Sequence, residues 1–386
     1  MKKVRCLNPI AQKGLDLLGQ DKYTIVDEEN AEAILVRSYK MHDMDLPKNL
    51  EAIGRAGAGV NNIPIDKCSE EGIVVFNTPG ANANGVKELV IASLFLSSRD
   101  IIGGVEWVNG LKGETEISKK VEKGKKQFAG PEILGKKLGV IGLGAIGSMV
   151  ANAARSLGME VVGYDPFISV EAAWGLSRTV KRCLSLDELV SDCDYISIHV
   201  PLLDATKGIL NKDMFSKMKD NVRIFNFSRA GLVNEDDLEE AINSGKVAKY
   251  VTDFPNERVL GMNNVINIPH LGASTPESEE NCAIMAVNEI VDYIENGNIT
   301  NSVNYPACNM GVCSTVSRIA INHKNIPNMV GQITTLLANK GLNIADMLNK
   351  SKEDWAYTLI DIEDEVSENV VNEIKNIEGI VKVRVL

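Results

Sequence analysis

The sequence predicts an α/β protein of three modules: a doubly wound parallel sheet, a smaller α/β domain before it, and a ferredoxin-like βαββαβ unit after it. The first observation is a glycine-rich turn, Gly142-Leu143-Gly144-Ala145-Ile146-Gly147, directly after the apolar run Leu138–Ile141 and far from the start of the chain. The second is a regular alternation of short apolar runs with helical patterns through the central part of the chain. The third is a change of texture near residue 310, after which a different series of short elements follows.

The segment before the glycine-rich turn has the rhythm of a small α/β domain. Short strand-like runs alternate with helical patterns, and an apolar helix is expected over residues 86–97. The strand-like runs are Val4–Leu7, Ile34–Ser38, Glu51–Gly57 and Ile73–Asn77. We expect a flavodoxin-like first domain over residues 1–97, completed by a return of the chain at about 283–305.

Strand signals recur at regular intervals in the central segment, with a helical pattern between successive strands. The expected strands are Leu138–Gly142, Glu160–Tyr164, Tyr195–Val200, Val222–Asn226, Lys249–Asp253 and Val265–Ile268. Strands joined by helices form a parallel sheet, and a strand followed by Gly-x-Gly-x-x-Gly and a helix begins a Rossmann unit. We therefore expect a Rossmann-type domain over residues 98–282, with a lysine-rich helical stretch at about 104–128 and a long helix over 277–295.

The last part of the chain predicts a third domain over residues 316–386, after a small, polar linker at 306–315. Its elements are expected in the order strand, helix, strand, strand, helix, strand, which is the ferredoxin-like split unit. The expected ranges are 318–323, 329–340, 344–350, 356–362, 366–376 and 381–385.

Composition excludes several classes of function. A formal net charge of −11 argues against nucleic acid as a partner, because its phosphates would repel the protein. The sequence contains no signal peptide, lipidation motif or apolar run long enough to span a membrane, so a cytoplasmic protein without membrane contact is expected. The seven cysteines are irregularly spaced without a Cys-x-x-Cys pair, and no metal site is expected.

The glycine-rich turn predicts a dinucleotide site. The first glycine allows a tight turn, the second lets the backbone approach a pyrophosphate, and the third lets the helix pack on the strand. The following strand ends at Asp165, whose carboxylate would bind ribose hydroxyls and repel a 2′-phosphate. The expected cofactor is therefore NAD.

Three chemically active side chains are expected at the carboxyl ends of neighbouring strands, where open parallel sheets bind their ligands. Arg229 follows the fourth central strand, Glu257 the fifth and His270 the sixth. Each has an ordinary structural explanation by itself, but together they suit hydride transfer at a secondary alcohol. His270 would accept the hydroxyl proton, Glu257 would orient the imidazole and stabilise its charged form, and Arg229 would bind a substrate carboxylate.

These residues lie in stretches that resemble the D-isomer-specific 2-hydroxyacid dehydrogenase family over roughly residues 1–305. The stretches are Arg55–Ile63, Asn77–Gly80, the glycine-rich turn, Asn226–Arg229 and Pro269-His270. The resemblance implies a substrate-binding first domain, an NAD-binding second domain and catalytic roles for Arg229, Glu257 and His270. The cofactor contacts that it implies are Thr78, Gly142, Gly144, Ala145, Ile146, Gly147, Asp165, Val200, Pro201, Phe227, Ser228, Arg229, Asp253, His270, Leu271, Gly272 and Ala273.

Two departures from the family pattern concern the loop that carries Glu257. The family usually has Asp-Val-Phe before its Glu, whereas this chain has Thr252-Asp253-Phe254, so the Asp that contacts the nicotinamide is displaced by one position. The residue after the Glu is Arg258, where the family usually has Pro. This change could alter the loop.

The last module resembles an ACT domain, the effector-binding module appended to phosphoglycerate dehydrogenases of serine synthesis. The matching stretches are His323–Pro327 and Gly341–Ala345. The resemblance implies that His323, Asn325 and Asn343 bind L-serine between two paired domains of a homodimer or homotetramer. The turn that usually reads Pro-Gly is Pro327-Asn328 here, and the alternative is an ACT domain that serves only oligomer assembly.

Oxidation of 3-phosphoglycerate to 3-phosphohydroxypyruvate, in L-serine biosynthesis, is the activity that the resemblance implies. A phosphorylated substrate needs more contacts than Arg229 supplies, and the candidates are Arg37, Ser38, Arg55 and Lys87, each of which can equally be a solvated surface residue. One alternative is a reductase of glyoxylate, hydroxypyruvate or another 2-keto acid. Another is a non-catalytic NAD(H)-sensing protein, which would need no proton-transfer group.

Overall fold

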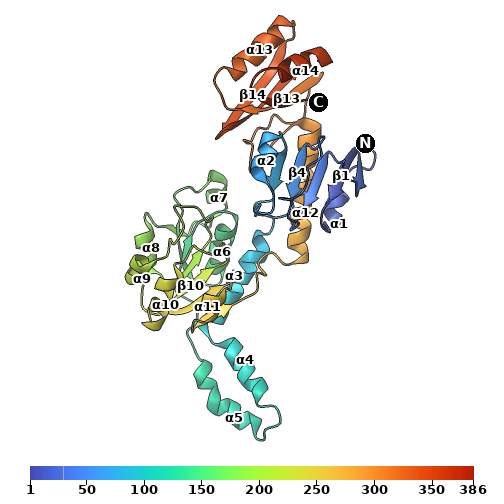
Figure 1. Cartoon of the computed structure of the whole chain (residues 1–386). Helices are drawn as coiled ribbons and strands as arrows, with labels where there is room; N and C mark the ends of the chain where they lie inside the picture. The colour runs from blue at the N-terminus through green and yellow to red at the C-terminus, as the bar shows by residue number, and fades with distance from the viewer. Residues whose placement is uncertain (29) are drawn as a thin grey trace. The chain divides into compact units, whose positions relative to one another are not determined.

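The computed structural model describes residues 1–28 and 30–386, which form two compact units (Figure 1). Residues 1–81 and 276–386 form the first unit, and residues 82–275 form the second. The boundaries lie earlier than the expected 97/98 and 282/283. The reason is that helix α3 (Ala83–Ser98) contributes Val86, Val90 and Leu94 to a core of the second unit. Helix α12 (Pro276–Asn296) instead packs within the first unit.

The first domain is a five-stranded parallel sheet in the order β2-β1-β3-β4-β5, which is the flavodoxin-like order that the sequence predicts. The strands are β1 (Lys2–Cys6), β2 (Tyr23–Val26), β3 (Ala33–Val36), β4 (Ala52–Arg55) and β5 (Val74–Asn77). Helices α1 (Gln12–Leu15), α2 (Ile65–Glu70) and α12 accompany them. A Cβ on Gly54 would lie 2.8 Å from Ile290 Cδ1, so glycine in β4 lets α12 pack closely on the sheet.

The second unit contains a seven-stranded parallel sheet in the order β12-β11-β10-β9-β6-β7-β8, which confirms the Rossmann-type prediction. Its strands are β6 (Lys137–Ile141), β7 (Glu160–Tyr164), β8 (Lys181–Arg182), β9 (Tyr195–Ile198), β10 (Val222–Asn226), β11 (Val247–Thr252) and β12 (Val265–Asn267). Its helices after the glycine-rich turn are α6 (Ala145–Ser156), α7 (Val170–Gly175), α8 (Leu186–Asp192), α9 (Lys212–Lys217), α10 (Glu235–Asn243) and α11 (Glu257–Leu260). The sequence did not predict β8, because two exposed basic residues carry no apolar pattern.

The lysine-rich stretch forms two helices where a continuous one was expected. Helix α4 (Ile101–Gly110) and helix α5 (Ile117–Gly124) are followed by a short 3₁₀ turn, Lys125–Phe128, and project from the second unit (Figure 1). Gly113 interrupts the pattern with a φ of 88°. Neither helix has a buried residue, although α4 is strongly apolar.

The C-terminal domain has the predicted ferredoxin-like architecture. Its antiparallel sheet has the order β14-β15-β13-β16, and its two helices supply one core with the sheet. The elements are β13 (Ser317–Lys324), α13 (Met329–Asn339), β14 (Ile344–Lys352), β15 (Trp355–Ile362), α14 (Glu368–Lys375) and β16 (Ile380–Val385).

The other face of this sheet packs on the first domain. Tyr357 and Leu359 of β15 belong to the same apolar core as Tyr293 of α12. Arg384 of β16 lies over the Tyr293 ring, with 4.3 Å between the guanidinium carbon and the ring centroid, and its Nη1 lies 3.0 Å from Glu51 Oε2. The C-terminal domain and the first domain therefore share one interior.

Candidate active site

The glycine-rich turn has the geometry that pyrophosphate binding requires. Gly142 has a φ of 88°, and a Cβ there would lie 2.5 Å from the carbonyl oxygen of His199. A Cβ on Gly147 would lie 2.0 Å from the carbonyl oxygen of Gly142, so the third glycine lets α6 pack against the turn. A Cβ on Gly144 would have no atom within 4 Å, so this glycine faces open space at the start of α6. Ala145 and Ile146 follow it with their N–H groups in the first turn of the helix.

Asp165 links the end of β7 to the glycine-rich turn. Its Oδ2 accepts a hydrogen bond from the N–H of Leu143 at 2.8 Å, and its Oδ1 accepts from the N–H of Phe167 at 2.8 Å. Each carboxylate oxygen keeps a further lone pair. The side chain is thus fixed at the edge of the turn, where ribose hydroxyls would bind.

Asn226 holds the loop that carries Arg229. Its Nδ2 donates to the carbonyl oxygen of Arg229 at 2.9 Å, and its Oδ1 accepts from the N–H of Ser228 at 3.2 Å. Ser228 Oγ donates to the carbonyl oxygen of Ile198 at 2.8 Å, which ties the loop to the neighbouring strand. The Arg229 side chain is exposed, with its Nη1 donating to the Ser228 carbonyl.

Asp253 is a buried carboxylate that interacts electrostatically with both Arg229 and His270. It is only 2% exposed, and its Oδ1 has no partner among the described residues. Burial raises the pKa of its carboxyl group, while the nearby charges of His270 and Arg229 and the N–H of Gly272 oppose this shift. Thr252, by contrast, points into the sheet, where its Oγ1 donates to the carbonyl oxygen of Asn226 at 3.0 Å. Of these two residues, Asp253 is the one that faces Arg229 and His270.

His270 and Glu257 both lie exposed at the end of the sheet. The His270 ring meets the Phe254 ring edge to face, with centroids 4.9 Å apart. Glu257 begins α11, whose N-cap Asn256 accepts from the N–H of Val259 at 2.9 Å. Across residues 1–28 and 30–386, no hydrogen bond joins Glu257 to His270. Catalytic hydrogen bonds often form only with substrate bound.

Arg258 stands where the family usually has proline, and its side chain anchors the loop that carries Glu257. Its Nη2 pairs with Asp236 and, at 3.0 Å, with Glu239 Oε2. Both carboxylates belong to α10, so Arg258 fixes α11 on α10. The departure from the family pattern therefore introduces an ion-pair anchor beside Glu257.

The residues expected to bind a substrate phosphate have varied environments. In the first unit, Arg37 Nη1 lies 2.7 Å from Glu279 Oε1, Ser38 donates its N–H to Asn8 Oδ1, and the Arg55 side chain lies across Gly57. Thr78, which is fully buried, donates its N–H to the carbonyl oxygen of Gly57. In the second unit, Lys87 Nζ lies 3.6 Å from Glu88 Oε1.

The expected effector residues lie at two ends of the C-terminal sheet. Asn325 follows β13 and donates to the carbonyl oxygen of Glu353, whereas Asn343 precedes β14 and donates to Glu363. The two ends are roughly 25 Å apart at ~3.3 Å per residue. His323 is buried, and its Nε2 interacts with Thr358 Oγ1 at 2.9 Å and Asn349 Oδ1 at 3.3 Å.

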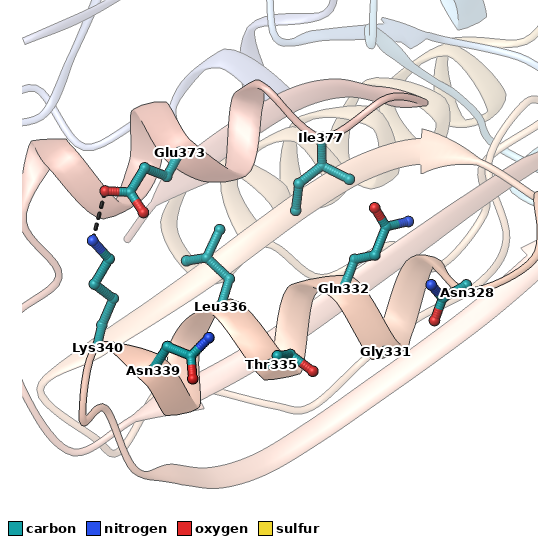
Figure 2. A pocket seen from close by; sticks show the side chains of 9 residues that line it. All are labelled: Asn328, Gly331, Gln332, Thr335, Leu336, Asn339, Lys340, Glu373 and Ile377. Atoms are coloured by element: carbon teal, nitrogen blue, oxygen red, sulfur yellow. Dashed lines mark hydrogen bonds and ion pairs between the residues drawn. The ribbon is translucent and has the colours of Figure 1, made fainter.

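Asn328 stands where the family's turn usually has glycine, and it adopts the backbone conformation that glycine favours. Its φ is 66°, in the left-handed region that favours glycine and that asparagine tolerates better than most residues. Figure 2 shows it at one end of a groove of about 670 Å³ along α13, with the Lys340–Glu373 ion pair at the other end. The backbone of the family's turn is therefore compatible with this sequence.

His199 follows β9 beside Val200 and Pro201, and sequence reasoning assigned it no role. Its Nε2 lies 2.8 Å from Ser197 Oγ, and burial lowers its pKa to about 4, so the imidazole is neutral. Within the described ranges, no group of three or more His, Cys, Asp or Glu side chains could hold a metal ion, and no helix is long and apolar enough to cross a bilayer.

Comparisons with known proteins agree with these features. The profile of the D-isomer specific 2-hydroxyacid dehydrogenase NAD binding domain matches residues 105–272. D-3-phosphoglycerate dehydrogenase of Haemophilus influenzae is 31% identical over 348 residues, which cover 87% of this chain and 81% of that protein. The Archaeoglobus fulgidus and human proteins of the same name are each 35% identical, over 79% and 73% of this chain. The chain spans only 60% and 52% of the length of these two relatives.

Solved structures show the same architecture. NAD+-bound 3-phosphoglycerate dehydrogenase of Entamoeba histolytica has a TM-score of 0.61 and 28% identity, covering 78% of this chain and 98% of that one. A glyoxylate reductase from Paecilomyes thermophila has a TM-score of 0.64 and 25% identity, also over 78% of this chain and 98% of that one.

Proposed function

The chain belongs to the D-isomer specific 2-hydroxyacid dehydrogenase family, and on this premise we propose that it oxidises 3-phosphoglycerate to 3-phosphohydroxypyruvate with NAD, in L-serine biosynthesis. The observation that carries the proposal is the charge set Arg229, Asp253 and His270, which follows neighbouring strands of the sheet that also carries the glycine-rich turn. The similarity to D-3-phosphoglycerate dehydrogenases from several organisms supports the choice of substrate.

The open side of Gly144 and the fixed carboxylate of Asp165 fit NAD. The proposed contacts around the pyrophosphate and ribose are Gly142, Gly144, Ala145, Ile146, Gly147 and Asp165. Those further along the cofactor are Thr78, Val200, Pro201, Phe227–Arg229, Asp253 and His270–Ala273. When bound, NAD accepts the hydride that leaves C2 of the substrate.

The protein's own side chains accept the substrate proton and bind the substrate carboxylate. The imidazole of His270 takes the proton of the C2 hydroxyl, while the guanidinium of Arg229 binds the substrate carboxylate and the developing carbonyl oxygen. Glu257 stabilises the protonated imidazole and is a positioning residue. Asp253 takes the place of the family's displaced Asp, because Thr252 is engaged with β10. The reaction yields 3-phosphohydroxypyruvate, NADH and one proton, which His270 returns to solvent.

Initial rates of NADH formation at alkaline pH test the proposal, with 3-phosphoglycerate compared with glycerate and lactate. We expect turnover of the phosphorylated acid alone. Turnover of only an unphosphorylated acid would contradict it and would favour a 2-keto-acid reductase, which the similarity to a glyoxylate reductase structure also permits. Tight NADH binding with no turnover of any acid would favour a sensor.

The phosphate contacts have their own test. We propose Arg37, Ser38, Arg55 and Lys87 as the groups that bind the substrate phosphate. Arg55→Ala or Lys87→Ala should reduce kcat/KM for 3-phosphoglycerate by about 100-fold, because charge-assisted phosphate contacts are lost. An equal loss for an unphosphorylated 2-hydroxyacid would rule out a phosphate-specific role.

L-Serine is the proposed effector of the C-terminal domain. Antiparallel pairing of β14 with a second copy would bring Asn343 of the partner subunit to the sheet end that carries Asn325. Those two carboxamides are the proposed direct contacts, and His323 braces the turn through its Nδ1 and the Lys324 carbonyl at 2.8 Å. Rates measured with and without millimolar serine test this role, and an unchanged rate would favour an assembly function for the domain.

A homodimer or homotetramer is the proposed assembly. The exposed apolar side chains of α4 support it, since Ile101, Ile102, Val105 and Val108 line a helix without a buried residue. Large exposed apolar patches commonly mark protein contacts.

A further inference from the structure

The ring plane of His270 has to be set by its neighbours, because burial does not fix it. The side chain is exposed at the end of the sheet, and the torsion that orients a histidine ring has broad preferences. A general base must present its accepting nitrogen to the proton that it takes. Glu257, the carboxylate proposed to stabilise the protonated ring, makes no hydrogen bond to it within residues 1–28 and 30–386. Another contact therefore orients the imidazole.

Phe254 supplies a ring that packs against this imidazole. The two ring centroids lie 4.9 Å apart with 61° between the ring planes, which is an edge-to-face arrangement. Pairs of this kind prefer defined orientations and are stabilised beyond the area that they bury. Phe254 is half-buried, whereas His270 is exposed, so the phenyl ring is the better fixed of the two. The contact therefore restricts the plane that the imidazole adopts.

Thr252 fixes the backbone that carries the Phe254 ring. Its Oγ1 accepts a hydrogen bond from the N–H of Phe254 at 3.2 Å and donates one to the carbonyl oxygen of Asn226 at 3.0 Å. Thr252 is only 1% exposed, so water does not compete for this hydroxyl. The family usually has Asp at this position, and an ionised carboxylate can only accept. The hydroxyl of Thr252 can therefore link the end of β10 to Phe254 as a carboxylate could not.

The same hydrogen bonds reach the loop of Arg229. Asn226, whose carbonyl oxygen accepts from Thr252, donates from its Nδ2 to the carbonyl oxygen of Arg229 at 2.9 Å. Asn226 is also only 1% exposed. The Arg229 loop and the backbone of Phe254 are thus both tied to Asn226, one directly and the other through a single hydroxyl.

We propose that Phe254 is a positioning residue, which holds the His270 imidazole in the plane that takes the C2 hydroxyl proton and is itself held by Thr252. The inference rests on the proposed function, because that function makes His270 the base. Phe254 has no group that exchanges a proton, so its effect on the reaction is one of orientation alone.

Steady-state kinetics of Phe254→Leu and Phe254→Tyr test the proposal with 3-phosphoglycerate and NAD. Phe254→Leu should lower kcat by about tenfold, with KM and the Kd for NADH within about twofold of wild type, because orientation alone is lost. Deuterium at C2 should slow this variant more than wild type, because the chemical step then limits the rate. Phe254→Tyr keeps the ring and should restore kcat to within about threefold of wild type.

Thr252→Val tests the support of the ring, since it keeps the branched shape and removes the hydroxyl. We expect it to lower kcat in the same direction as Phe254→Leu, again with little change in NADH affinity. Wild-type kcat in Phe254→Leu would overturn the proposal. A parallel loss of kcat and NADH affinity that Phe254→Tyr fails to restore would also overturn it, because that pattern indicates a general structural role.

NMR of protein labelled at histidine Cε1 gives a readout that needs no turnover. The chain has four histidines, and His270→Gln assigns the signal of interest. Phe254→Leu should move the His270 signal through loss of the phenyl ring current, while those of His42, His199 and His323 stay in place. An unmoved His270 signal would overturn the inference. Failure of the wild-type protein to oxidise 3-phosphoglycerate, with a His270 signal that still depends on Phe254, would contradict the proposed substrate alone.

Discussion

At the scale of single residues, the position of the Asp253 carboxylate decides which residue at the end of β11 can interact with Arg229 and His270. Asp253 is buried beside the charges of Arg229 and His270, whereas Thr252 is bound to β10. Asp253 follows the last residue of β11, so the one-residue displacement from the family pattern retains a carboxylate near Arg229 and His270. The nearby N–H of Gly272, in the loop that carries His270, also lowers the pKa of Asp253 against the effect of burial.

Asp253→Asn should lower kcat/KM for hydroxyacid oxidation by about 100-fold, since it removes the charge that stabilises cationic His270 and Arg229. Thr252→Ser, which keeps the hydroxyl bound to Asn226, should stay within about threefold of wild type. Steady-state rates over a range of pH check both variants. A full loss in the serine variant with little loss in Asp253→Asn would reverse the assignment.

Glu289 of α12, a carboxylate that is only 8% exposed, should also affect stability. Because burial raises its pKa from 4.5 to about 7, its stabilising effect is complete below pH 4.5 and is lost as the pH rises through 7. Glu289→Gln removes this dependence, so its free energy of unfolding relative to wild type should rise by about 2 kcal/mol between pH 5 and pH 8. Urea unfolding at the two pH values measures this difference. A constant difference would show that Glu289 titrates normally.

At the scale of elements, the glycine-rich turn has separable requirements. Gly144→Ala adds a Cβ into open space, so the protein should keep its Tm while NADH binding weakens by about tenfold or more. Gly147→Ala places a Cβ against the Gly142 carbonyl and should lower the Tm by about 3–10 °C. Thermal unfolding and NADH fluorescence titration separate the two effects. Equal Tm losses would contradict the distinction.

The elements that the sequence predicts best are those whose burial leaves a clear pattern. The wholly buried β3 and the central strands β9 and β10 appear as apolar runs, and the ACT-like elements agree with their ranges within about two residues. The strands β2 and β8 lie at sheet edges and are partly exposed, so their side chains show little periodicity.

In the candidate site, too, the sequence predicts the features that leave a local pattern and misses those that do not. Strand-end positions predict Arg229, Glu257 and His270 as candidates, because sheet topology alone brings strand ends to one edge. The anchor of Arg258 depends on ion pairs between α11 and α10, which no local pattern encodes, and the clamp of Asn226 lies within an irregular loop that has no periodicity.

At the scale of the whole molecule, the chain divides where its helices pack. The apolar pattern of Val86–Ser97 indicates a helix but not which sheet it covers, so the boundary before α3 could not be predicted from sequence. Likewise, the sequence did not indicate that the face of the C-terminal sheet opposite its own helices packs on α12.

Assembly can be tested at this scale through α4. Val105→Asp places a charge in its exposed apolar surface and should reduce the mass measured by light scattering toward that of one 42.0 kDa chain. Glu106→Gln on the same helix is the control and should retain the oligomer. An unchanged mass for Val105→Asp would exclude α4 from the assembly contact.

The interior shared by the first domain and the C-terminal domain has an evolutionary consequence. A module held only by a linker can be lost, gained or exchanged between enzymes as a separate cassette. Here, deletion would strip the cover from Tyr293 and leave Glu51 without Arg384, while grafting the module onto another dehydrogenase would expose Tyr357 and Leu359. A substitution at the shared interior of either domain therefore restricts which side chains the other domain can accept there.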